Sequence, residues 1–150
     1  MQEILYLSIA IGLVLSLVSV EFFGVILGGF FVPGYLAMHI TKPLYILHVY
    51  VIAMITVIVV RALSGYMIIY GRKMLVMSVL IGYLLNLTSG LLNLGWISGL
   101  DEMHFGIIIP GLLAYWMQRQ GIIETMVLSI TGTVMTRFIL TIVVGGALSL

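Results

Sequence analysis

Cationic side chains in apolar surroundings are the residues of this chain best suited to chemistry. Arg137 stands near the middle of a long apolar run, and Arg61 lies one position from the equivalent place in an earlier run. An arginine at membrane depth is costly and normally faces a bundle interior or a water-filled path. Its planar guanidinium offers a fork of donors suited to carboxylates. Arg119 and Lys42 occupy matching positions just after two interrupted segments. We therefore expect these four cations to contact carboxylates of another molecule.

Other roles stay open for the same side chains. The two arginines within the long runs can instead pair internally with Glu21 or Glu124, or extend to a lipid headgroup. Lys42 and Arg119 can instead anchor the chain to lipid phosphates.

Catalytic and metal-binding motifs are poorly represented. The sequence contains no Gly-rich phosphate loop, no H-x-x-x-H pair and no acidic metal cluster. Asp101 and Glu102 are adjacent in a predicted loop, which is ordinary for a solvated turn. Zero cysteines exclude disulfides, cysteine-ligated zinc and thiol chemistry. We predict no catalytic residue, no cofactor and no metal site in this chain.

The composition is that of an integral membrane protein. Hydrophobic residues make up 63% of the chain and charged residues 7%, against roughly 25% charged in soluble domains. The mean hydropathy is +1.31. A net charge of +1, with no basic run, argues against a nucleic-acid partner. The apolar run at 4–20 lacks a cationic leader and a cleavage pattern, which predicts a retained transmembrane helix.

One stretch of the chain occurs twice. Residues 29–37 read GFFVPGYLA, and residues 106–114, seventy-seven positions later, read GIIIPGLLA. The offset divides the chain into a first membrane repeat at 1–77 and a second at 78–150. The repeated positions that we expect to shape the backbone are Gly29, Pro33, Gly34, Gly106, Pro110 and Gly111.

The Pro-Gly pairs predict a broken helix in each repeat. Proline removes a backbone donor and clashes with a preceding turn, and glycine admits backbone angles that other residues avoid. In a membrane such breaks survive only inside protein or along a wet cavity. Paired breaks indicate a site at a repeat interface. We expect an all-α polytopic fold whose repeats are inverted if each broken segment crosses fully, and parallel if each is re-entrant; we favour the inverted arrangement.

The junction between the repeats carries a small positive cluster. Arg72 and Lys73 follow Gly71 directly. Because cytoplasmic loops are enriched in lysine and arginine, this loop is predicted to be cytoplasmic.

Several of these motifs together resemble a known family. The stretches Val32–Ala37, Tyr70–Lys73, Ile109–Ala114 and Gln118–Gly121, with Glu21 ahead of Gly24, are similar to CapC, also called PgsC. The resemblance covers essentially the whole chain. Two family cations are absent, because Phe22 follows the acid at the end of the first helix and Met103-His104 precedes the second broken segment.

The resemblance implies a multi-pass subunit of the bacterial cytoplasmic membrane that takes part in poly-γ-glutamate capsule synthesis. It implies an ATP-dependent amide ligase (CapB or PgsB) as one partner, and a CapA- or PgsA-like protein acting mainly outside the membrane as another. The chain itself would be non-catalytic and would anchor the ligase through the loop that carries Arg72 and Lys73. It would also help the polyanionic strand to cross the bilayer, in contact with Arg119, Arg137, Arg61 and Lys42. Whether it forms a homo-oligomer is open.

Two alternatives remain open at the level of the sequence. The chain can act alone as a small secondary transporter or channel for an anionic solute, which repeats and broken helices would serve equally well. It can also be an assembly scaffold whose glycines serve packing only.

Overall fold

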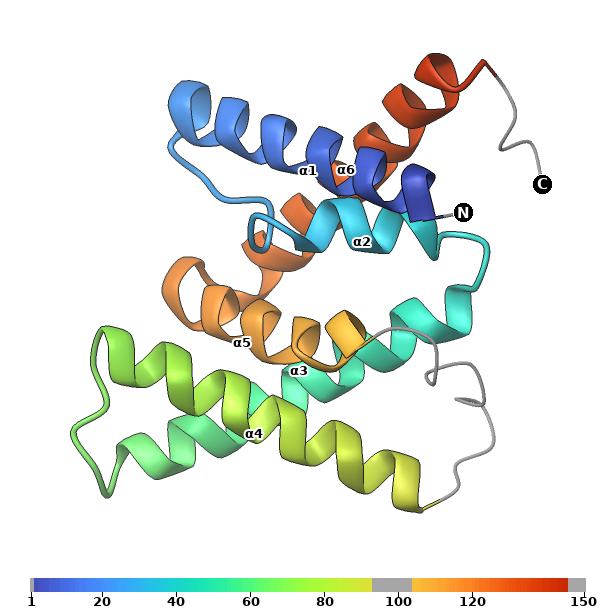
Figure 1. Cartoon of the computed structure of the whole chain (residues 1–150). Helices are drawn as coiled ribbons and strands as arrows, with labels where there is room; N and C mark the ends of the chain where they lie inside the picture. The colour runs from blue at the N-terminus through green and yellow to red at the C-terminus, as the bar shows by residue number, and fades with distance from the viewer. Residues whose placement is uncertain (1, 93–103, 146–150) are drawn as a thin grey trace. The chain divides into compact units, whose positions relative to one another are not determined.

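The computed structural model describes residues 2–92 and 104–145, and every regular element in that part of the chain is helical. The all-α prediction is thereby confirmed, while Asp101, Glu102 and Met103 lie outside the described residues. Figure 1 shows the elements in chain order: α1 (Gln2–Phe23), α2 (Val32–Met38), α3 (Pro43–Ser64), α4 (Arg72–Leu91), the 3₁₀ turn η2 (His104–Ile107), α5 (Ile109–Gln120) and α6 (Ile122–Val143).

Four of these helices, α1, α3, α4 and α6, are long and apolar enough to cross a membrane. At 1.5 Å per residue, a helix of 22 residues extends about 33 Å, which matches the roughly 30 Å of bilayer hydrocarbon. The structure therefore agrees with a membrane protein. The helices α2 and α5 have 7 and 12 residues and are too short to span alone. The inverted arrangement of the repeats stays a prediction.

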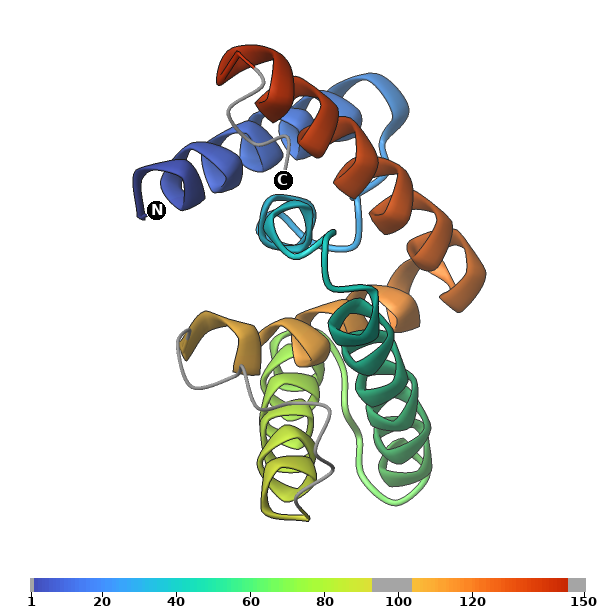
Figure 2. The same cartoon turned by 90° about the vertical axis from the view of Figure 1, so that its right-hand side faces the viewer.

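The chain forms two compact units. The first consists of residues 1–42 and 120–150 and contains α1, α2 and α6. In this unit α2 packs against both α1 and α6, which also contact each other; Figure 2 shows α2 end-on between them. The division of the sequence at residue 77 stays a prediction about repeats, since compact units are defined by packing alone.

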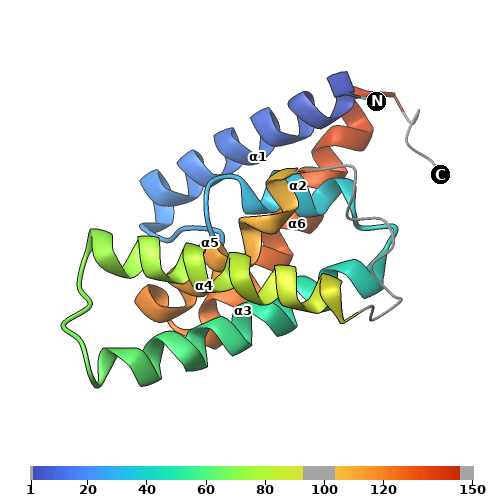
Figure 3. The same ribbon diagram turned by 60° about the horizontal axis from the view of Figure 1, so that its bottom comes forward.

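The second unit consists of residues 43–119 and contains α3, α4 and α5. The helices α3 and α4 lie side by side, joined by residues 65–71 (Figure 3). His48 Nε2 lies 3.4 Å from Asn86 Oδ1 and links these two helices. The amide of Gln118, on α5, donates to Ser78 Oγ on α4 at 3.4 Å.

The structure corrects the predicted position of the helix breaks. Pro33 lies in the first turn of α2 and Pro110 is the second residue of α5, where a missing backbone donor costs nothing. The interruption comes earlier, at the non-helical residues 24–31 and at η2. Proline therefore begins each short helix and does not break one.

The predicted role of Gly34 and Gly111 is also corrected, because neither has a positive φ. Glycine is needed at both positions because it has no side chain. A Cβ on Gly34 would lie 2.7 Å from Ile9 Cα, and a Cβ on Gly111 would lie 2.6 Å from Val79 Cα. Backbone touches backbone at both places, so each short helix sits directly on a long one.

Candidate functional site

The non-helical segment ahead of α2 is held by a side chain from the other end of the chain. Gln120 accepts from the Ile26 backbone N–H through Oε1 at 3.1 Å and donates through Nε2 to the Ile26 carbonyl at 3.0 Å. The Gln120 amide thus satisfies both backbone groups of Ile26, as the backbone of a neighbouring β-strand would. Two glycines with positive φ follow, Gly28 at 77° and Gly29 at 128°. In a membrane this pairing matters, because lipid offers no partners to free backbone groups.

We predict that Gln120→Glu destabilises the first unit by about 1–3 kcal/mol, the cost of an unsatisfied buried polar group. A carboxylate accepts from the Ile26 N–H but cannot donate to the Ile26 carbonyl. The measurement is thermal unfolding of the purified protein in detergent. Gln118→Glu is the matched control: Gln118 is also half-buried, but its partner Ser78 Oγ is a hydroxyl that can turn and donate to a carboxylate. Equal losses in both variants would contradict the role of the Ile26 pairing.

Arg137 is half-buried on α6 and reaches the end of α2. Its Nη1 donates to the Ala37 carbonyl at 3.3 Å. Carbonyls in the last turn of a helix lack partners within the helix, and a cation there also favours the helix dipole. His39 completes this end of α2: its Nδ1 lies 3.1 Å from the Tyr35 carbonyl, and its ring stacks on Tyr35 at 4.6 Å. The contact gives Arg137 a structural task, while its predicted polyanion contact stays a prediction.

Arg119 is exposed near the end of α5 and is held by aromatic rings. Its Nη1 donates to the Tyr115 hydroxyl at 3.1 Å. Its guanidinium carbon lies 5.9 Å from the ring centroids of both Tyr115 and Trp116. Within residues 2–92 and 104–145 no acid is recorded within ion-pair distance of it. The guanidinium is therefore pre-positioned, and the described carboxylates leave its charge unneutralised.

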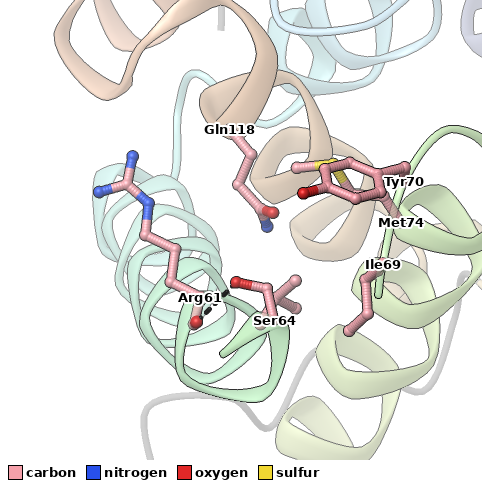
Figure 4. A pocket seen from close by; sticks show the side chains of 7 residues that line it. Arg61, Ser64, Ile69, Tyr70, Met74 and Gln118 are labelled. Atoms are coloured by element: carbon pink, nitrogen blue, oxygen red, sulfur yellow. Dashed lines mark hydrogen bonds between the residues drawn. The ribbon is translucent and has the colours of Figure 1, made fainter. Parts of the chain in front are cut away.

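Arg61 lines a cavity of about 210 Å³ in the second unit, together with Val60, Ser64, Ile69, Tyr70, Met74 and Gln118. Figure 4 shows the Gln118 amide directed toward the other labelled side chains and the Arg61 guanidinium directed away from them. The Ser64 hydroxyl donates to the Arg61 carbonyl at 2.7 Å. A polyanion would therefore meet the Arg61 charge outside this cavity.

The remaining predicted residues are spread over both units. Lys42, Arg72 and Lys73 are exposed, as a contact with lipid phosphate, polyanion or partner protein requires. Gly106 is buried within η2, and Gly29 is buried ahead of α2. The Ser16 hydroxyl donates to the Gly29 carbonyl at 3.4 Å. No group of three or more potential metal ligands occurs among the residues that the structure describes.

Sequence reasoning missed two features of this site. The first is Gln120, whose partner lies 94 positions away and leaves no local signal. The second is the row of small residues on which each short helix sits, Ser8 and Gly12 on α1 and Ser78 and Gly82 on α4. Their spacing of four residues was visible, because it places them on one helix face.

Comparison with known proteins gives consistent matches. Residues 11–126 match the family model described as "Capsule biosynthesis CapC". The chain is 34% identical over 123 residues to "PGA biosynthesis protein CapC" of Bacillus subtilis (strain 168), covering 81% of this chain and 83% of the relative. It is 36% identical over 120 residues to "Capsule biosynthesis protein CapC" of Bacillus anthracis, covering 79% and 80%. No solved structure matches the chain.

Proposed function

We propose that this chain, which belongs to the capsule biosynthesis CapC family, is the membrane subunit of a poly-γ-glutamate capsule synthesis complex. It works in the bacterial cytoplasmic membrane, anchors an ATP-dependent amide ligase and helps the polyanionic strand to cross. The names of the two relatives support the process, capsule and PGA biosynthesis. The four apolar helices support the membrane location.

The observation that carries the crossing role is the setting of Arg119. Its charge is exposed, oriented by Tyr115 and Trp116, and unmatched by any described carboxylate. A strand of carboxylates is a suitable counter-charge, since arginine binds carboxylates through two parallel N–H donors. An inside-negative potential adds about 2.3 kcal/mol per 100 mV for each negative charge that crosses fully outward.

The anchoring role is assigned to the Gly71-Arg72-Lys73 junction at the start of α4. Arg72 and Lys73 are exposed at the start of this helix, so they can meet an acidic surface of a partner. We predict that the double variant Arg72→Glu, Lys73→Glu reduces co-purification of the ligase at least tenfold, because two attractive charges become repulsive. The measurement is pull-down through a tag on this chain. With the variant Arg72→Gln, Lys73→Gln, recovery of the ligase should lie between that of the wild type and that of the charge-reversed variant. Unchanged recovery with the charge-reversed variant would remove this junction from the interface.

A reconstitution experiment separates this proposal from a transporter that acts alone. The purified chain is inserted into liposomes without partners, and flux of glutamate and other small anions is measured. The proposal expects background flux from the chain alone and polymer export only after the ligase and the CapA-like protein are added. Saturable anion transport by the chain alone would favour the alternative.

A further inference from the structure

We propose that the two compact units are equivalent products of an internal duplication that have exchanged their third helices. In this arrangement α6 completes the unit begun by α1 and α2, and α3 completes the unit built on α4 and α5. The exchange goes beyond the repeat predicted from the sequence and does not depend on the proposed function. It rests on matching contacts of the first and short helices and on matching buried positions of the third helices.

The first helices of the units match at a spacing of seventy residues. The buried polar and glycine positions of α1 are Ser8, Gly12 and Ser16, and those of α4 are Ser78, Gly82 and Asn86. The contacts match as well as the residues. A Cβ on Gly12 would lie 2.7 Å from Gly34 Cα, and a Cβ on Gly82 would lie 2.7 Å from Gly111 Cα.

The short helices match at a spacing of seventy-seven. Tyr35 N–H donates to the Phe31 carbonyl and Leu112 N–H donates to the Ile108 carbonyl, both at 3.1 Å. Each bond closes the helical turn that contains the proline. The same turn is therefore built twice, from equivalent residues.

The third helices match at a spacing of eighty. Positions 49, 52, 53, 56 and 60 are buried on α3, and positions 129, 132, 133, 136 and 140 are buried on α6. The Thr56 hydroxyl donates to the Ile52 carbonyl at 2.7 Å, and the equivalent Thr136 hydroxyl donates to the Gly132 carbonyl at 2.8 Å. The two helices thus bury the same face, as two equivalent helices must if each is to pack on the other repeat.

The exchange follows from where the chain changes units. It leaves the first unit after Lys42 and returns to it after Arg119. These are the two cations that the repeat places at equivalent positions, seventy-seven residues apart. Both repeats therefore send their third helix into the other unit from the same point. The boundary between repeats in this proposal lies in the loop at 65–71, which is exposed except for Ile69. Neither repeat contains all three helices of one unit.

The test is an intramolecular cross-link in the full-length chain. The natural sequence has no cysteine, so an introduced pair reacts without competitors. A Cβ at position 132 would lie 3.1 Å from Leu27 Cβ, close to the 3.5–4.5 Å of a disulfide, and Leu27→Cys removes the side-chain atoms that would crowd it. The variant Leu27→Cys, Gly132→Cys also carries a protease site within residues 65–71. The second variant, His48→Cys, Asn86→Cys, carries the same site and is bridged by a short bis-methanethiosulfonate, which forms a reducible disulfide with each cysteine and releases two sulfinates.

Both variants should migrate as monomers before cleavage. After cleavage at 65–71 both should keep their two halves joined under non-reducing conditions and release them on reduction, because each bond links one repeat to the other. The matched control is Leu27→Cys, Ile130→Cys, since Ile130 is exposed on another face of α6; it should separate after cleavage. Cross-linking only as a dimer would overturn the exchange within one chain. If the two halves of the Leu27→Cys, Gly132→Cys variant separate after cleavage under non-reducing conditions, at normal abundance and thermal stability, the placement of α6 is overturned.

Discussion

Replacing Gly34 by alanine is expected to prevent the first unit from assembling. The added Cβ would lie 2.7 Å from both Ile9 Cα and the Ser8 carbonyl oxygen. Overpacking ordinarily costs about 1–3 kcal/mol, and here the obstacle is backbone that cannot rotate away, so the loss should reach or exceed the upper end of that range. The Ser8 hydroxyl bond to the Gly34 carbonyl, 2.7 Å long, would be strained by the same shift. Abundance in membranes and thermal unfolding in detergent measure the effect.

Two further alanine variants give this prediction its controls. Gly111→Ala should do the same in the second unit, where the new Cβ would lie 2.6 Å from Val79 Cα. Gly90→Ala lies on α4 with open space around it, so it should be neutral or stabilise the helix by up to about 1 kcal/mol. Wild-type unfolding temperatures for Gly34→Ala and Gly111→Ala would show that the short helices do not sit on α1 and α4 as described.

Arg119→Gln is expected to lower polymer output at least about tenfold while the complex still assembles. A hydrogen bond to a charged group is worth about 1.5–3 kcal/mol, which is roughly a factor of ten or more. Glutamine keeps hydrogen bonding and removes the charge, and the exposed position of Arg119 spares the core. The readout is polymer produced per unit of purified complex, with the abundance of every subunit measured in the same preparation.

Two graded variants separate charge from orientation at this residue. Arg119→Lys keeps the charge but loses the planar guanidinium. Polymer output should therefore fall in part if Arg119 binds a carboxylate through two parallel N–H donors. Tyr115→Phe keeps the charge of Arg119 but removes the hydroxyl that accepts from it, and should have a smaller effect than Arg119→Gln. Normal output from an Arg119→Gln complex at unchanged abundance would end the strand-contact proposal for this residue.

The sequence by itself determined the class of the protein and the places where its two short helices begin. An apolar fraction of 63% is typical of a membrane protein, and four long apolar runs correspond to α1, α3, α4 and α6. The matched Pro-Gly pairs marked the starts of α2 and α5, because proline and glycine act on the local backbone. The family also followed from these local motifs.

Only the tertiary structure decided what each of those residues touches. The sequence analysis assigned Gly34 an unusual backbone angle, whereas its role is to let α2 reach the backbone of α1. Gln120 and Arg137 satisfy backbone groups 94 and 100 positions away, and the hydrophobic pattern could not pair them. In a soluble protein, an apolar stripe reveals which face of a helix is buried. In a membrane helix nearly every face is apolar, so the packing of small residues and a few polar contacts select the neighbour, and that selection is made in three dimensions.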